Sequence, residues 1–231
     1  MKKVKKLIAI FMSIVLLMSC FSIASFAVSG NVPADIIEMS SQVAVELEQE
    51  GIVLLKNEEN VLPLEGKKLN VFGVGSVCPF FGGAGSGCIT SENPVSFYDA
   101  LDERGVEYNT ELRELYEENC GTSAIPTTKH PVVNNALGLI LTKSQLPEMS
   151  VSELTDDIMN NAKAYSDTAL VMISRTSAEG TDLTEDILRI SDDERALIEK
   201  LNANFENIIV LLNISNIIEM GFIDEYENIK A

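Results

Sequence analysis

The sequence contains no tryptophan and a single histidine, His130. A serine triad needs a histidine as its general base, and His130 stands in an irregular stretch just before Pro131. Ser86 is the serine of a glycine-rich stretch, but Ala84 and Cys88 occupy the positions that glycines hold in a G-x-S-x-G elbow. These features argue against a serine hydrolase.

Basic residues are also scarce. The chain has 17 Lys and Arg against 35 Asp and Glu, which gives a formal net charge of -18. A field of this sign repels phosphate backbones and anionic lipid surfaces, whereas a neutral sugar is indifferent to it. We therefore expect no nucleic-acid partner, and the surplus charge also favours solubility.

Four of the few basic residues stand together at the start, between residues 2 and 6, before an almost unbroken apolar run from Leu7 to Leu17. This order is typical of an export signal, and the small residues Ser25 and Ala27 predict cleavage after Ala27. Two alternatives remain open: a lipid anchor at Cys20, or an uncleaved segment long enough to span a bilayer. We expect a secreted or envelope-attached protein that meets a membrane only through such a signal or anchor.

Cysteines number four, and removal of the signal would leave Cys78, Cys88 and Cys120. Their spacings match no zinc template, and an odd number does not indicate a disulfide framework. Export permits a bridge between Cys78 and Cys88, which flank the glycine-rich stretch. Buried free thiols are nevertheless the expected state.

The apolar residues recur with alternating helical and strand periodicity. The expected helices cover residues 34–50, 96–104, 110–119 (capped by Thr110), 151–164, 192–204 and 216–226, and the expected strands cover 52–55, 69–74, 106–109, 169–173 and 208–212. Strands separated by helices predict an α/β fold with an open, mostly parallel sheet, an α/β sandwich with flavodoxin-like layering.

The expected organisation is a signal over residues 1–27, a helix and extended segment over 28–66, and an α/β domain over 67–231 with an insertion near 121–150. The alternation calls for another strand where the sequence reaches Ala231. We therefore expect the last strand or strands to be missing and the natural protein to continue.

The expected strand over residues 69–74 leads into many glycines. Gly73 and Gly75 are similar to the start of a dinucleotide-binding fingerprint, but Cys78 holds its third glycine position and Asn109 stands where the ribose-binding acid is expected. The run from Gly82 to Gly87 indicates close approach of backbone to a neighbour, which can be sugar hydroxyls, another domain or the turn itself.

Glu179 is the sharpest candidate for chemistry, because it follows the 169–173 strand, and parallel sheets bind ligands beyond the carboxyl ends of their strands. Asp182, Glu185 and Asp186 are near neighbours in sequence. Like charges in a partly dry cleft would raise the pKa of Glu179 toward the range of a general acid. A solvated acidic loop with an unperturbed Glu179 is the alternative on these grounds alone.

Several ordered pieces of the sequence are similar to one known domain, and they extend over about residues 34 to 231. They are residues 50–57 (EGIVLLKN), 62–64 (LPL), 71–73 (VFG), 82–87 (GGAGSG), 173–175 (ISR), 179–182 (EGTD), 211–213 (LLN) and 218–219 (IE). In this order and spacing they resemble the second, α/β domain of family 3 glycoside hydrolases.

In that family a (β/α)8 barrel supplies an aspartate nucleophile and the α/β domain supplies the acid/base glutamate, so the resemblance implies Glu179 and a retaining mechanism. Arg175, Asp182, Gly83, Gly85 and Ser86 are the expected substrate-binding residues. No cofactor and no metal are expected. A signal followed directly by this domain resembles members with reversed domain order, so the barrel is expected downstream, with the aromatic surface that this tryptophan-free chain lacks.

The function implied is that of a domain in an exported β-glucosidase-like enzyme, which hydrolyses β-glucosides or short oligosaccharides from the non-reducing end. The segment alone is expected to be inactive, because one carboxyl of the pair is missing. The alternative is a non-catalytic α/β module that binds a sugar or a protein.

Overall fold

The computed structural model describes residues 32–81, 95–123, 147–176 and 182–231, and the predicted signal lies outside them. Contacts divide the chain after Val53 into two compact units. In the first unit, helix α2 (Ala34–Gly51) confirms the expected helix, and none of its residues is buried. Among the described helices, none has the length and apolar character needed to cross a membrane.

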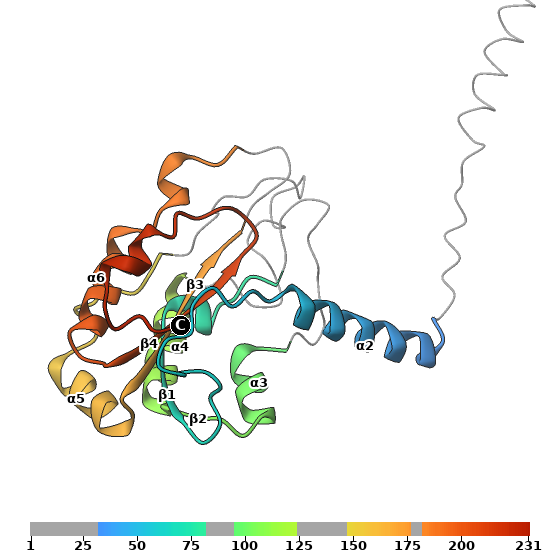
Figure 1. The fold of residues 1–231 in the computed structure, drawn as a ribbon, viewed down its shortest axis with the longest axis horizontal. Helices are drawn as coiled ribbons and strands as arrows, with labels where there is room; N and C mark the ends of the chain where they lie inside the picture. Colours follow the sequence, from blue (N-terminus) through green and yellow to red (C-terminus); the bar gives the residue numbers. More distant parts are fainter. Residues whose placement is uncertain (1–31, 82–94, 124–146, 177–181) are drawn as a thin grey trace, which may run out of the picture. The chain divides into compact units, whose positions relative to one another are not determined.

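The second unit is built on a four-stranded parallel sheet with the order β2-β1-β3-β4 (Figure 1). Its strands are β1 (Lys68–Phe72), β2 (Glu107–Tyr108), β3 (Thr168–Arg175) and β4 (Asn207–Ile214). β3 is buried along its whole length, and it pairs with β4 from Thr168–Asn207 to Arg175–Ile214. The predicted α/β fold with a parallel sheet is confirmed.

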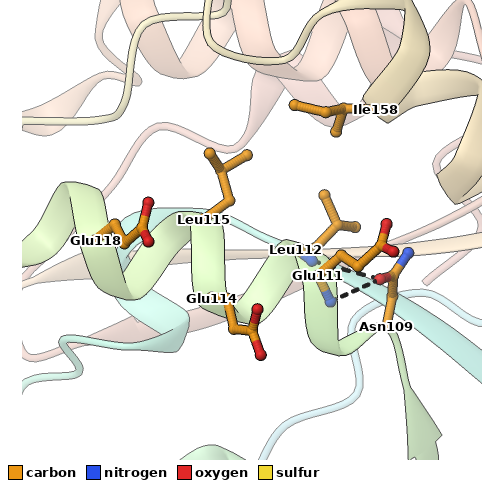
Figure 2. Close-up of a pocket in the computed structure, with 7 residues that line it drawn as sticks. All are labelled: Asn109, Glu111, Leu112, Glu114, Leu115, Glu118 and Ile158. Carbon is orange, nitrogen blue, oxygen red and sulfur yellow. Dashed lines mark hydrogen bonds between the residues drawn. The ribbon is translucent and has the colours of Figure 1, made fainter.

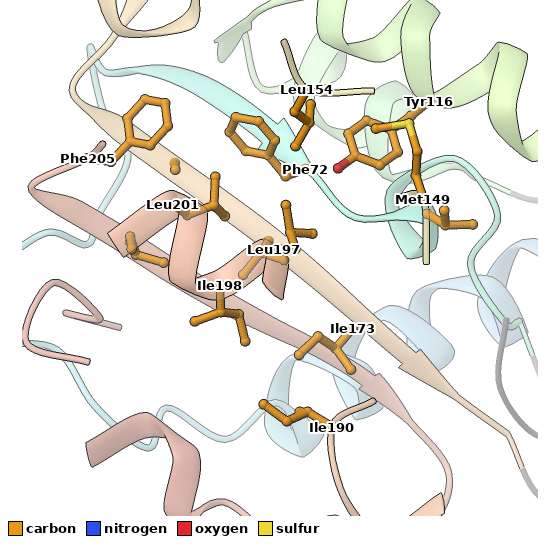
Figure 3. Close-up of a cluster of buried hydrophobic side chains, with 14 of the residues drawn as sticks. Phe72, Tyr116, Met149, Leu154, Ile173, Ile190, Leu197, Ile198, Leu201 and Phe205 are labelled. Atoms are coloured by element: carbon orange, nitrogen blue, oxygen red, sulfur yellow. The ribbon is translucent and has the colours of Figure 1, made fainter. Parts of the chain in front are cut away.

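Helices cover both faces of this sheet. They are α3 (Phe97–Glu103), α4 (Thr110–Ser123), α5 (Asp156–Tyr165) and α6 (Asp192–Asn202). The larger apolar cluster lies between one face and α4, α5 and α6, and it includes Phe72, Tyr116 and Leu201 (Figure 3). The smaller cluster joins the other face to α3 through Val71 and Leu101. Successive residues of β1 and β3 alternate between the clusters, as strand geometry requires.

Local hydrogen bonds explain where the helices begin. Capping boxes start α3 at Ser96 and α6 at Ser191, in each case with an acidic residue three positions later. The predicted cap at Thr110 is wrong. Asn109 accepts hydrogen bonds from the backbone N–H groups of Glu111 and Leu112, while its amide donates to the buried Asn70 side chain.

Two expected elements are absent from the described chain. Residues 52–55 form no strand, and their apolar side chains are exposed, since this run pairs with no described strand. The expected helix over 216–226 is replaced by a short 3₁₀ turn, Gly221–Glu225. This segment instead leads to the last residues, where Ile229 lies parallel to Ile208 of β4 and is fully buried.

Candidate functional site

The carboxyl ends of β1, β3 and β4 lie at one edge of the sheet, because β3 pairs in parallel with β1 on one side and with β4 on the other. The segments that leave this edge begin at Gly73, Thr176 and Ser215. Open parallel sheets bind ligands at this edge. The predicted site is therefore expected at this edge.

The segment after β1 is tied closely to the sheet. Ser76 donates a hydrogen bond to the Gly73 carbonyl at 2.8 Å. The Asn213 side chain of β4 accepts from the N–H of Phe80 and donates to its carbonyl, at 2.8 and 3.0 Å. These bonds fix the stem of the glycine-rich stretch, whereas Gly83, Gly85 and Ser86 themselves lie outside the described residues.

Cys78 belongs to the same stem, and its side chain is buried. The expectation of a free thiol is wrong for this residue, because Cys78 is disulfide-bonded. The sequence offers Cys20, Cys88 and Cys120 as partners. The number and spacing of the cysteines favoured free thiols. They could not identify this disulfide, because an odd cysteine count carries no information on which two thiols come together in the fold.

Glu148 is an acid at this edge that was not among the predicted site residues. Its carboxylate accepts hydrogen bonds from the N–H groups of Val74, at 3.1 Å, and Met149, at 2.9 Å. The pKa of Glu148 is raised to about 7, chiefly because the carboxyl is withdrawn from water; the two N–H donors oppose this rise, and the charges of Glu194 and Asp193 add to it. Glu148 follows Pro147 within the stretch interpreted as an insertion, so no periodic pattern marked it.

We expect Glu148→Gln to change how stability depends on pH. A carboxyl whose pKa is higher in the folded than in the unfolded chain binds more protons when folded, so stability falls as the pH rises from the unfolded value to about 7. Relative to the Gln variant, the wild type should lose about 2–3 kcal/mol of unfolding free energy between pH 4.5 and pH 8. Urea titrations over this range measure the difference.

Glu153→Gln is the matched control, because it removes the same charge from an exposed position a few residues away. The difference between wild type and this control should stay nearly constant with pH. Parallel curves for wild type and Glu148→Gln would contradict the raised pKa.

At the end of β3, the Arg175 side chain is buried and pairs with Glu194 of α6 through two hydrogen bonds, at 2.7 and 2.5 Å. The structure thus places this predicted substrate-binding residue inside the protein, with its guanidinium turned to protein partners. The capping box of α6 contains Glu194 and could be found in the sequence. Its pairing with Arg175 joins residues 19 apart and has no sequence signal.

Glu179 lies outside the described residues, between Thr176 and Asp182. Asp182, Glu185 and Asp186 are exposed, and Glu185 pairs with Arg189 at 2.9 Å. Hydrogen bonds, chiefly from the Thr184 side chain, lower the pKa of Asp186. Because exposed charges are screened by water, these three acids would raise the pKa of a neighbouring carboxyl only weakly in this arrangement.

A pocket of about 240 Å³ lies away from these segments, along α4 and facing Ile158 of α5 (Figure 2). Leu112 and Leu115 form its apolar side, and glutamates 111, 114 and 118 its charged side. No group of His, Cys, Asp or Glu suited to hold a metal occurs among the described residues. The pocket contains none of the residues predicted for a sugar site.

The chain contains a parallel sheet with helices on both faces, and hydrogen bonds hold the segments at the carboxyl ends of its strands. This is an open α/β domain, the class that binds ligands at this edge. Residues 52–231 match the glycosyl hydrolase family 3 C-terminal domain, and the chain belongs to this family. It is thus a glycoside hydrolase domain of the kind found in β-glucosidase-like proteins.

Its relatives are much longer proteins. The chain is 32% identical over 189 residues to a beta-glucosidase of Ruminococcus albus, which covers 79% of this chain and 18% of that protein. It is 28% identical to beta-glucosidase A of Butyrivibrio fibrisolvens, over 84% of this chain and 24% of that protein. The chain therefore spans about a fifth to a quarter of the length of these curated relatives.

Solved structures show the same fold. A beta-glucosidase of Paenibacillus barengoltzii superposes with a TM-score of 0.64 at 30% identity, covering 75% of this chain and 18% of that one. Beta-glucosidase 3B of Thermotoga neapolitana, in complex with α-D-glucose, gives a TM-score of 0.64 at 28% identity, covering 81% and 26%.

Proposed function

We propose that the chain is the acid/base domain of an exported, retaining β-glucosidase-like enzyme, with Glu179 as the proton donor. The observation that carries the proposal is the position of β3. This strand ends at Arg175, at the ligand-binding edge of the sheet, only four residues before Glu179 in the sequence. Membership of the family supports the reaction class.

A retaining glycosidase needs two carboxyls about 5 Å apart, one to attack the anomeric carbon and one to protonate the leaving oxygen. We expect the attacking carboxylate to come from a barrel domain in the same polypeptide, in keeping with the greater length of the relatives. In the second step Glu179 would take a proton from the incoming water.

The other predicted substrate-binding residues would contact the sugar in different ways. Asp182 is exposed, so its carboxylate is free to accept hydrogen bonds from sugar hydroxyls. Gly83, Gly85 and Ser86 follow the stem held by Asn213 and would bring backbone to the sugar. Stacking against the sugar ring is left to the barrel, because the chain has no tryptophan.

The test compares the chain alone with the chain extended by its genomic continuation, on aryl β-glucosides. We expect hydrolysis, with a β-configured first product, only from the longer protein, since both carboxyls are then present. An inactive longer protein that still binds glucose or cellobiose in calorimetry would favour the non-catalytic sugar-binding module. Activity of the chain alone would contradict the division of the two carboxyls between domains.

A further inference from the structure

The ion pair between Arg175 and Glu194 differs from the other ion pairs in the described part of the chain. Its two side chains are 0% and 6% exposed. In each of the other pairs, at least one side chain is 48% exposed or more. Removing two charges from water costs several kcal/mol per ion, and apolar side chains of similar volume often stabilise a fold as well or better. Stability alone therefore does not explain the pair.

The contacts of the guanidinium indicate what the pair does. Arg175 Nη1 donates to the carbonyl of Ser174 at 3.0 Å, within β3, as well as to Glu194. Nη2 donates to the other carboxylate oxygen and, at 3.4 Å, to the carbonyl of Arg189. One planar group thus connects the end of β3 with a residue 14 positions later.

Glu194 completes the connection on the helix side. Its carboxylate accepts a hydrogen bond from the N–H of Ser191 at 2.8 Å, in the capping box that begins α6. Both ends of residues 176–189 are therefore fastened to one buried ion pair. The five-donor fork of arginine suits this arrangement, whereas lysine offers a single point charge.

We propose that Arg175 and Glu194 are a positioning pair, which fixes both ends of the 176–189 segment and so orients Glu179 for proton transfer. The proposal rests on the proposed function for Glu179, but the fastening of the segment can be tested without catalysis. Arg175 then acts through the segment and not by touching the sugar.

The test needs variants that break the pair without leaving one buried charge. Single substitutions such as Glu194→Ala leave a buried guanidinium without its carboxylate partner and can unfold the chain. The double variant Arg175→Met with Glu194→Gln removes both charges and keeps an acceptor for the Ser191 N–H. Arg195→Met is the matched control, because it removes an arginine from the next position of α6, where the pair with Glu225 is exposed.

Hydrogen exchange followed by mass spectrometry on the 231-residue chain is the first measurement. We expect peptides within 176–190 to exchange about tenfold faster in the double variant than in Arg195→Met, while peptides of β1 and α3 are unchanged. A merely structural role would speed exchange across the whole second unit. Unchanged exchange in 176–190, or a uniform increase, would overturn the proposal.

Kinetics of the longer enzyme is the second measurement. In the double variant we expect kcat for phenyl β-glucoside to fall by about 10- to 100-fold with KM little changed, because a small misplacement of the acid is costly. Dinitrophenyl β-glucoside needs little protonation and should be hydrolysed nearly as fast as by wild type. Equal losses on both substrates would overturn the proposal, whereas a Glu179→Gln variant with full activity would refute the proposed function and leave the exchange result standing.

Discussion

Glu179→Gln should slow the hydrolysis of phenyl β-glucoside by the longer enzyme by about 10²–10⁴-fold, the usual contribution of a positioned general acid. Glutamine has nearly the same shape but carries no transferable proton, so departure of a poor leaving group loses its assistance. Dinitrophenolate leaves without a proton, and its glucoside should lose far less. Steady-state rates on a series of aryl glucosides give the dependence on leaving-group pKa, which should become steeper in the variant.

Glu185→Gln is the matched control for this experiment. It removes the same charge six residues later, from an exposed carboxylate that pairs with Arg189. We expect no change in the leaving-group dependence for this variant. If Glu179→Gln also left that dependence unchanged, Glu179 would have no role as the proton donor.

The order of strands and helices could be predicted because burial leaves a clear mark in the sequence. The runs 169–173 and 208–212 are nearly pure Val, Ile, Leu and Ala, and the structure forms them into β3, which is buried along its whole length, and β4, the partly buried outer strand beside it. In residues 192–202 the apolar side chains recur at helical spacing, and a capping box precedes them, so local sequence was enough to predict α6.

The errors share a different cause, since each depended on a partner distant in sequence. An apolar run such as 52–55 becomes a strand only when another strand pairs with it, and no described strand does. Residues 216–226 were expected to be helical, yet they lead to Ile229, which is buried and forms a parallel β-bridge with Ile208 of β4. Local periodicity carries no information on such competition.

The candidate site was predicted in the same uneven way. The carboxyl end of β3 follows from the parallel sheet, and with it the neighbourhood of Glu179. The pairing of Arg175 with Glu194, the hydrogen bond from Val74 to Glu148, and the hydrogen bonds between Asn213 and Phe80 all join residues far apart in the chain. The family resemblance implied a sugar contact for Arg175, whereas in the structure its guanidinium donates hydrogen bonds to Glu194 and to the carbonyl of Ser174.

Gly73→Ala should destabilise the chain by about 2–5 kcal/mol, combining the cost of a backbone of positive φ with that of overpacking. Gly73 has a φ of +93°, and a Cβ there would lie 2.5 Å from the carbonyl oxygen of Met172 on β3. The three nearest atoms all belong to the backbone of Met172, so none can move aside by a change of rotamer. The expected result is a lower midpoint in urea unfolding with an unchanged slope.

Gly105→Ala separates the two causes, because Gly105 has a φ of +65° but nothing within 4 Å of its Cβ position. It should lose only the backbone share, about 1–2 kcal/mol. Equal losses at the two positions would mean that β1 and β3 can separate at this edge without cost. A larger loss at Gly73 means that the stem of the glycine-rich stretch is held against β3 by direct backbone contact, which is the rigidity that a site at this edge requires.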